Sequence, residues 1–252
     1  MILSRKLSKS KNIKHAFFNK LGGRSKGIYK SLNCGKGSND DQKLIVKNLR
    51  VVTESMNVAN ENLILMHQSH SNNVIVIDKK NKNNKEFKSD ALITQIKGLV
   101  LGVLTADCVP IILYDQNSET VACIHAGWKG CLSGVIENTL SKLKAINLNN
   151  NIIACVGPCI GKNNYETDLD FFNIFEKKSN FNSSFFTKKN DKKYFFDIRG
   201  FVNNKLKILG VNYIDNLEMD TFQDSDNFFS YRRSRKLREN DYGRCISVIA
   251  LK

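Results

Sequence analysis

Proline, histidine and tryptophan are scarce in this chain, whose 252 residues include two prolines, four histidines and one tryptophan. Long hydrophobic runs are also missing, since the most apolar stretch, residues 98–114, is interrupted by Thr105, Asp107 and Pro110. That stretch is too short and too polar to span a bilayer. The basic N-terminus lacks the apolar segment of a secretory signal, and there is no proline-rich linker or internal repeat. We expect one cytoplasmic domain over residues 1–252, without a membrane partner.

Acidic residues are outnumbered by basic ones, 24 against 39, which gives a net charge of +15. Such an excess favours nucleic acids, membrane surfaces or anionic substrates as partners. Here lysine and asparagine are abundant throughout the sequence without a known nucleic-acid-binding motif, so we expect no nucleic-acid partner. The seven cysteines are odd in number and several lie in apolar runs. This pattern indicates free thiols in a reducing compartment rather than a disulfide framework.

The spacing of apolar residues predicts a mixed α/β domain. Helical spacing occupies residues 40–56, 132–143, 171–175 and 201–209. Short apolar runs typical of buried strands occupy residues 91–94, 99–104, 109–114, 121–124, 152–156, 211–217 and 245–251. Two further runs, residues 63–67 and 74–78, are interpreted as a hairpin with His70 at its turn.

Three short motifs each place one metal-binding residue where an apolar run ends in a loop: Gln68-Ser69-His70, Thr105–Pro110 and His125–Gly130. His70, Cys108 and His125 would supply three ligands and leave a fourth zinc position for water or substrate, as in catalytic sites. Cys108 with one histidine would also suit a nucleophile and its base, because both roles need a thiol of lowered pKa. The second histidine favours the metal site.

His67 and Asp107 lie beside these candidate ligands. His67 and His70 would point to opposite faces of a continuous strand, and His67 continues an apolar run, so we interpret it as structural or as a support for a ligand. Asp107 interrupts an apolar run, where an unpaired carboxylate is costly to bury. A hydrogen bond to a ligand histidine, general acid–base catalysis or the capping of a turn would each account for it.

Basic residues near two of the motifs are candidates for binding phosphate. Lys129 lies at the start of a predicted helix, where free N–H groups and the helix dipole favour an anion. Arg232 and Arg233 open a basic run over residues 232–238, which is either a solvated face or an anion site. We therefore assign Lys129, Arg232 and Arg233 as candidate phosphate-binding residues.

Taken together, the motifs resemble the laccase-domain family of multifunctional purine nucleoside phosphorylases. The resemblance spans nearly the whole chain, in the right order. It is carried by Leu21-Gly22-Gly23, Ser31-Leu32-Asn33, the three ligand motifs, Gly157-Pro158, Ile160-Gly161, Tyr165-Glu166 and Phe229–Arg233.

The resemblance implies an α+β fold, a single domain in which mixed β-sheets are sandwiched between helices. It implies zinc bound by His70, Cys108 and His125, with Cu²⁺ as an alternative metal. It implies an enzyme that phosphorolyses adenosine, inosine and methylthioadenosine and also deaminates adenosine. The sequence leaves open whether this enzyme is a monomer or a homodimer. Its small-molecule partners would be purine nucleosides and phosphate, and Asp107, Cys108 and His125 would be its catalytic residues.

The sequence departs from the family pattern at a few positions. Lys129 stands where arginine is more usual, which keeps the charge but loses the bidentate fork. Asn164, Asp220 and Gln223 stand where many relatives have cysteines, which weakens any case for further soft ligands.

Three other functions stay open at this point. The chain could be a Cys-His hydrolase acting on a peptidoglycan precursor, or a basic binding protein without catalysis. It could also be a copper-dependent polyphenol oxidase, although four histidines are too few for several copper centres.

Overall fold

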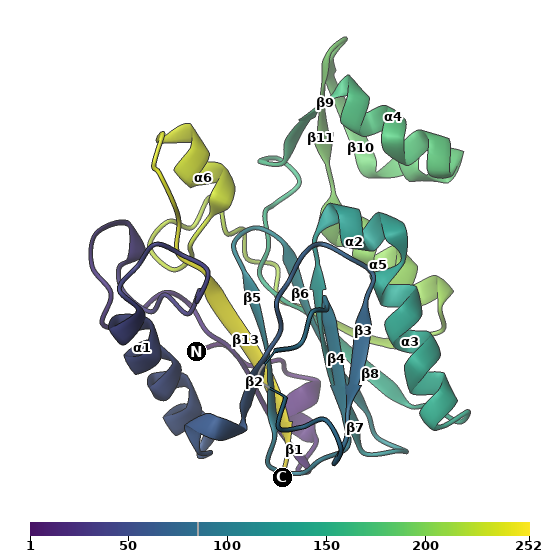
Figure 1. Cartoon of the computed structure of the whole chain (residues 1–252). Coiled ribbons are helices and arrows are strands. Elements are labelled where there is room, and N and C mark those ends of the chain that lie inside the picture. The colour runs from purple at the N-terminus through teal and green to yellow at the C-terminus, as the bar shows by residue number, and fades with distance from the viewer. Residues whose placement is uncertain (85) are drawn as a thin grey trace.

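The computed structural model describes residues 1–84 and 86–252, which form two stacked β-sheets with helices on both outer faces (Figure 1). The four-stranded sheet has the order β1-β13-β5-β2, comprising Ile13–Phe17, Cys245–Leu251, Val100–Thr105 and Leu63–Leu65. The six-stranded sheet has the order β12-β8-β6-β7-β4-β3, comprising Tyr213–Asn216, Ile152–Val156, Val109–Asp115, Thr120–Ala126, Ala91–Thr94 and Val74–Ile77. Both sheets are mixed, which confirms the predicted α+β class.

The helices lie mainly outside the two sheets (Figure 1). The α-helices are α1 (Gln42–Met56), α2 (Trp128–Ser133), α3 (Val135–Ile146), α4 (Leu169–Lys178), α5 (Ile198–Ile208) and α6 (Tyr231–Lys236). Short 3-10 helices occupy Leu7–Lys9, Gly27–Tyr29, Asn60–Asn62 and Asn180–Phe185. A small third sheet, β10-β11-β9, comprises Phe186–Asn190, Lys193–Phe196 and Glu166–Asp168 and packs with α4 at one end of the molecule.

Helix α1 shows how the sequence dictates its local structure. The Asp41 carboxylate accepts a hydrogen bond from the amide of Lys43 and caps the first turn. Ile45 and Val52 lie on one face and pack with the four-stranded sheet, and the helix ends at Asn57 in the left-handed conformation. The helix predicted over residues 40–56 is therefore confirmed.

Three apolar cores hold the four layers together. The central core lies between the sheets and includes Leu101, Ile112 and Cys123. A second core joins the six-stranded sheet to α3 and α5, and a third joins the four-stranded sheet to α1. Because both faces of each sheet are covered, the strands are nearly continuous apolar runs, as the sequence indicated.

The hairpin predicted from residues 63–67 and 74–78 is wrong. β2 pairs in parallel with β5 in the four-stranded sheet, whereas β3 pairs in parallel with β4 in the six-stranded sheet. The segment that contains His70 therefore crosses from one sheet to the other. The single helix predicted over residues 132–143 is also two helices, because Gly134 adopts φ +101° between α2 and α3.

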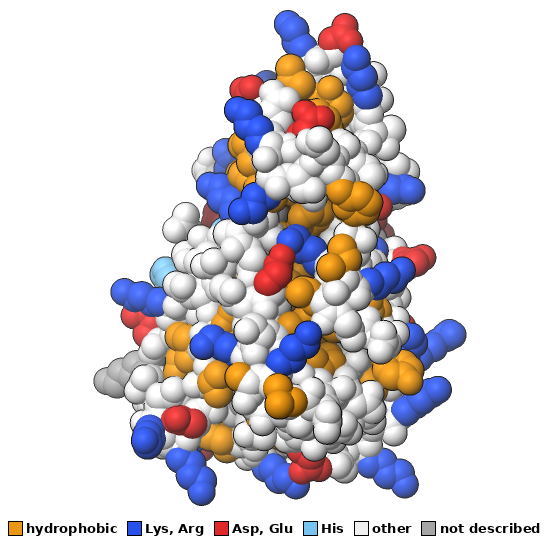
Figure 2. All heavy atoms as spheres, turned by 90° about the vertical axis from the view of Figure 1, so that its right-hand side faces the viewer, with side chains coloured by type: hydrophobic (Ala, Val, Ile, Leu, Met, Phe, Trp, Pro, Cys, Tyr) orange, Lys and Arg blue, Asp and Glu red, His pale blue; other side chains and the backbone are white. Residues whose placement is uncertain are grey.

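In the part of the chain that the structure describes, no helix has both the length and the apolar composition needed to cross a membrane. On the face that carries α3 and α4, lysine and arginine side chains are scattered among acidic and apolar ones (Figure 2). This face therefore offers no continuous basic stripe.

Candidate metal centre and adjoining cavities

Three predicted ligands meet at one end of the sheets. His70 lies in the crossing between β2 and β3, Cys108 in the turn between β5 and β6, and His125 near the end of β7. One ligand atom from each lies within 4.8 Å of the others, and Cys108 Sγ is 3.7 Å from His70 Nε2. Ligands of a tetrahedral zinc lie about 3.5 Å apart, given its usual bond lengths. The group can therefore hold a metal ion after small side-chain shifts.

The backbone is strained at two positions beside this group. His70 has φ +60° and Asp107 has φ +79°, both in the left-handed region that residues with a Cβ seldom adopt. Such conformations cost about 1–3 kcal/mol each and are concentrated at functional sites. Here the conformation of His70 turns its ring, and that of Asp107 turns the following residue, Cys108, toward the same point.

Asp90, at the start of β4, fixes two of the three candidate ligands. Its Oδ1 lies 2.8 Å from His125 Nδ1 and accepts a hydrogen bond from the His70 amide at 3.0 Å. Its other oxygen accepts from the Ser71 amide and hydroxyl, each at 2.7 Å. The carboxylate is buried, but its partners His125 and Ser71 hold its pKa well below the usual range. With Nδ1 engaged by Asp90, His125 turns Nε2 toward the cluster.

Asp90 was not among the residues predicted from sequence to support a ligand, which were Asp107 and His67. The signal that drew attention to Asp107, a carboxylate at the edge of an apolar run, is also present at Asp90, which directly precedes Ala91–Thr94. Only the three-dimensional pairing of β4 with β7 brings Asp90 next to His125.

Gly127 makes room for the candidate ligands. A Cβ at this position would lie 2.5 Å from His70 Cδ2 and 3.2 Å from Cys108 Sγ. The glycine between His125 and α2 thus allows the backbone to pass directly behind the cluster.

The histidines make Cys108 unusually acidic. Burial alone would raise the pKa of the Cys108 thiol, but His125 and His70 lower it to about 6. Burial would lower the pKa of His125, yet Cys108 and Asp90 raise it to about 9. A thiolate beside two imidazoles is a donor set that suits zinc and also copper.

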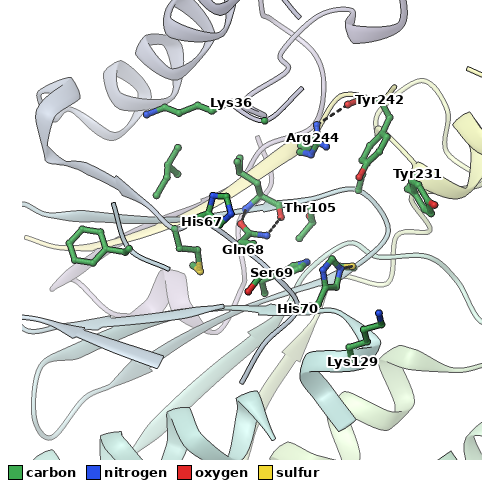
Figure 3. Close-up of a pocket in the computed structure, with 18 of the residues that line it drawn as sticks. Lys36, His67, Gln68, Ser69, His70, Thr105, Lys129, Tyr231, Tyr242 and Arg244 are labelled. Carbon is green, nitrogen blue, oxygen red and sulfur yellow. Dashed lines mark hydrogen bonds between the residues drawn. The ribbon is translucent and has the colours of Figure 1, made fainter. Parts of the chain in front are cut away.

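Two cavities meet at the cluster. The larger, about 780 Å³, is bordered by Gln68, Lys129, Tyr242 and Arg244 (Figure 3). The smaller, about 340 Å³, is lined by aromatic side chains from several elements, namely Trp128, Tyr165, Phe171 and Tyr231. His70, Cys108, Trp128 and Tyr231 border both cavities, so a metal at the cluster would face each of them.

The structure places Asp107 away from the two histidines. Its Oδ1 accepts a hydrogen bond from Thr221 Oγ1 at 2.7 Å, and its Oδ2 accepts from Ser230 Oγ and the Arg232 amide at 2.9 and 2.6 Å. The side chain is buried, and burial raises its pKa despite these donors. The hydrogen bond to a ligand histidine that was one interpretation of Asp107 is therefore made by Asp90 instead.

The three candidate phosphate-binding residues lie in different surroundings. Lys129 borders the larger cavity, with its ammonium 5.5 Å from the Trp128 ring centre. Arg232 borders the aromatic cavity and donates to the Glu166 carbonyl at 2.8 Å. Arg233 borders neither, because its guanidinium donates to the carbonyls of Thr221, Phe222 and Phe228.

His67 and His15 do not join the cluster. His67 is exposed, with Nδ1 3.7 Å from a Glu86 carboxylate oxygen, whereas His15 is buried and accepts the Ser4 amide through Nε2. At two of the positions that depart from the family pattern, Asn164 and Asp220 form a hydrogen bond of 2.6 Å with each other. They add no further soft ligand.

Residues 14–252 match the family model described as multi-copper polyphenol oxidoreductase laccase. A purine nucleoside phosphorylase of Rickettsia conorii is 32% identical over 218 residues, covering 86% of this chain and 89% of the relative. One of Corynebacterium glutamicum is 31% identical and covers 96% of each chain. The crystal structure of a Neisseria meningitidis protein of family DUF152 has a TM-score of 0.85 with 28% identity, covering 96% of each chain.

Proposed function

This chain belongs to the family described as multi-copper polyphenol oxidoreductase laccase, and we propose that it is a zinc-dependent purine nucleoside phosphorylase that also deaminates adenosine. Its substrates would be adenosine, inosine and methylthioadenosine, with phosphate as co-substrate. Relatives named purine nucleoside phosphorylase, which this chain matches over most of their length, support the proposal. The observation that carries it is the His70–Cys108–His125 group at the junction of two cavities.

Zinc fits the cluster better than several copper ions do. Two imidazoles and a thiolate around one zinc ion would leave its fourth tetrahedral position open, as in catalytic zinc sites. When bound, zinc would supply a Lewis acid where the two cavities meet. Among the described residues, His15 and His67 lie outside the cluster, so the protein offers no further histidines there for additional copper centres.

The smaller cavity suits a purine base. Its aromatic lining of Trp128, Tyr165, Phe171 and Tyr231 provides apolar surfaces on which a flat heterocycle can stack. A base in this cavity would lie beside the cluster, with the ribose directed into the larger cavity. In phosphorolysis a phosphate oxygen attacks the ribose C1′, and the purine leaves with the electrons of the C1′–N bond. In deamination water attacks C6 and ammonia leaves.

Lys129 and Arg232 are our proposed phosphate-binding residues beside the cluster. Lys129 borders the larger cavity and Arg232 the smaller, and each carries a positive charge that attracts a phosphate dianion. We leave Arg233 out, because its guanidinium is committed to backbone carbonyls.

For Asp107 we propose a positioning role. Its carboxylate joins the turn that carries Cys108 to the Ser230–Arg232 segment at the start of α6. Tyr231 in that segment borders both cavities, so the orientation of Asp107 sets the shape of the site.

A thiol hydrolase acting on a peptidoglycan precursor is the second candidate. The pKa of Cys108, lowered to about 6 beside His125, is the observation that favours it. Such an enzyme would keep its activity in chelator and lose it on alkylation of Cys108.

The test combines metal content with nucleoside turnover. The protein is purified without a metal-affinity step, zinc and copper are quantified, and adenosine is supplied with phosphate to the wild type, His70→Ala and His67→Ala. We expect about one zinc per chain in the wild type and in the His67→Ala control, and its loss in His70→Ala. Adenine with ribose 1-phosphate, and inosine, should form only where the metal is retained. A metal-free wild type without turnover would overturn the proposal.

A further inference from the structure

Arg244 is a half-buried cation at the edge of the larger cavity. Its guanidinium lies 4.3 Å from the Tyr242 ring centre and donates one hydrogen bond of 3.1 Å, to the Tyr242 carbonyl. Within residues 1–84 and 86–252, it forms no salt bridge with a carboxylate. Most of its five N–H donors are therefore available to a ligand.

A buried amide holds the backbone of Arg244 in place. The Asn33 side chain is fully buried, and its Oδ1 accepts hydrogen bonds from the amides of Gly35 and Arg244 at 3.0 and 2.9 Å. The Cys34 amide also donates to the Arg244 carbonyl. A Cβ on Gly35 would lie 2.7 Å from Arg244 Cδ, so the glycine leaves space for the arginine stem. Two segments far apart in the sequence are thus joined at the backbone of Arg244, and Gly35 leaves room for its side chain.

Among the described residues, basic side chains outnumber acidic ones around the larger cavity, and the pKa of the nearby Asp241 carboxylate is lowered, against the effect of burial, by the Asn39 amide and in part by the Arg244 charge. Lys36 follows Gly35 and borders the same cavity, and Figure 3 shows Lys36, Tyr242 and Arg244 on one side of it, with Lys129 beyond His70 on the other. The nearby Asp241 carboxylate is engaged by the Asn39 amide and the Tyr29 hydroxyl. Among the residues that the structure describes, Glu86 is the one carboxylate bordering the cavity, and it lies 3.7 Å from His67.

We propose that Arg244 and Lys36 form a phosphate-binding subsite across the larger cavity from Lys129. A guanidinium held over an aromatic ring keeps a planar fork free for two phosphate oxygens. Lys36, whose ammonium points away from Arg244 in Figure 3, adds a second charge on the same side of the cavity. The cavity, about 780 Å³, continues from the cluster to this subsite, so a single bound molecule can reach both.

The phosphate group has two chemical sources, and this part of the inference rests on the proposed function. Inorganic phosphate, the co-substrate, would make Arg244 its principal ligand in place of Lys129. A phosphate on the ribose 5′ position would instead make nucleoside 5′-monophosphates ligands of the same site.

Binding of each ligand alone is measured within the time of a single turnover, so that the subsite and the proposed reaction can fail separately. The wild type, Arg244→Gln, Lys36→Gln and the control Arg50→Gln, an exposed position on α1, are titrated with inorganic phosphate, AMP and adenosine. The backbone bonds to Asn33 and Cys34 do not depend on the Arg244 side chain, so the variant should fold; thermal unfolding checks this.

We expect Arg244→Gln to weaken phosphate or AMP binding about tenfold or more, and Lys36→Gln to weaken it less, while adenosine binding and the control stay unchanged. Loss confined to inorganic phosphate identifies the co-substrate, and loss of the preference for AMP over adenosine identifies a 5′-phosphate. A wild type that binds neither, or a folded Arg244→Gln that binds both as the wild type does, overturns the subsite. Phosphate binding that depends on Arg244 without nucleoside turnover keeps the subsite and removes the phosphorylase.

Discussion

At the scale of single residues, the site depends on side chains that hold the candidate ligands as much as on the ligands. Asp90 contacts the His125 ring and the backbone of His70 and Ser71, and Asp107 joins the Cys108 turn to α6. Asp90 directly precedes β4, and Asp107 lies in the three-residue turn between β5 and β6, so the rigid sheets fix the position of each.

Asp90→Asn should weaken zinc binding about 10–100-fold while the fold persists, because the amide cannot accept hydrogen bonds on both sides. In either orientation of the substituted amide, its NH₂ group would face another N–H donor, that of the His125 ring or that of the Ser71 backbone. Competition with a chromogenic chelator measures the affinity, and Asp78→Asn, an exposed carboxylate at a turn, is the matched control. Equal affinities in the two variants would contradict the assigned role.

Asp107→Asn separates positioning from proton transfer. An asparagine can keep all three hydrogen bonds if its Nδ2 donates to the Thr221 hydroxyl and its oxygen accepts from Ser230 and Arg232. We expect kcat to stay within about tenfold of the wild type, whereas loss of a general acid–base group costs about 10²–10⁴-fold. Asp107→Ala, which removes the bonds, should raise KM and lower kcat. An inactive but correctly folded Asp107→Asn would identify Asp107 as the proton carrier.

At the scale of elements, the breaks between helices and strands shape the site. Gly134 separates α2 from α3, and its φ of +101° lets α2 start at the cluster while α3 runs along the sheet. Trp128 and Lys129, in the first turn of α2, thereby border the larger cavity.

Gly134→Ala should lower the free energy of unfolding by about 1–2 kcal/mol through backbone strain alone. A Cβ there would meet nothing nearer than 3.8 Å, so no steric clash contributes. Gly37→Ala is the matched control, since Gly37 has open space and an ordinary φ. Urea unfolding measures the free energy of unfolding of both variants. Equal stabilities would show that Gly134→Ala causes no backbone strain.

The elements also show what sequence could predict. Long periodic or continuously apolar segments such as α1 and β8 were located closely, because their patterns arise from burial on known faces. β2 and β3 were paired with each other because they are neighbours in the chain, but tertiary packing gives each a parallel partner elsewhere. The three candidate ligands lie where apolar runs end, which the sequence shows, whereas His125, the partner of Asp90, is brought beside it only by the pairing of β4 with β7.

At the scale of the whole molecule, the N-terminal segment connects the two sheets. The Ser4 amide donates to His15 Nε2 on β1 of the four-stranded sheet, and the Ser4 hydroxyl donates to Asp215 on β12 of the six-stranded sheet. Burial lowers the pKa of His15 to about 4, although Ser4 and Asp215 oppose the shift. The bridge therefore requires a neutral imidazole.

This requirement makes the fold sensitive to acid. Above pH 6.5 His15 is neutral in both the folded and the unfolded chain, so it adds no pH dependence. Between pH 6.5 and about 4, His15 is protonated in the unfolded chain but stays neutral in the folded protein. This difference lowers the free energy of unfolding by about 3 kcal/mol in total. His15→Gln keeps an acceptor for the Ser4 amide without the titration, so its stability should fall less steeply over this range. Urea unfolding at several pH values measures how steeply the free energy of unfolding falls with pH in the chelator-treated wild type and His15→Gln. The exposed His67→Gln is the control. If the wild type and His15→Gln lose stability equally steeply, His15 does not control the acid sensitivity.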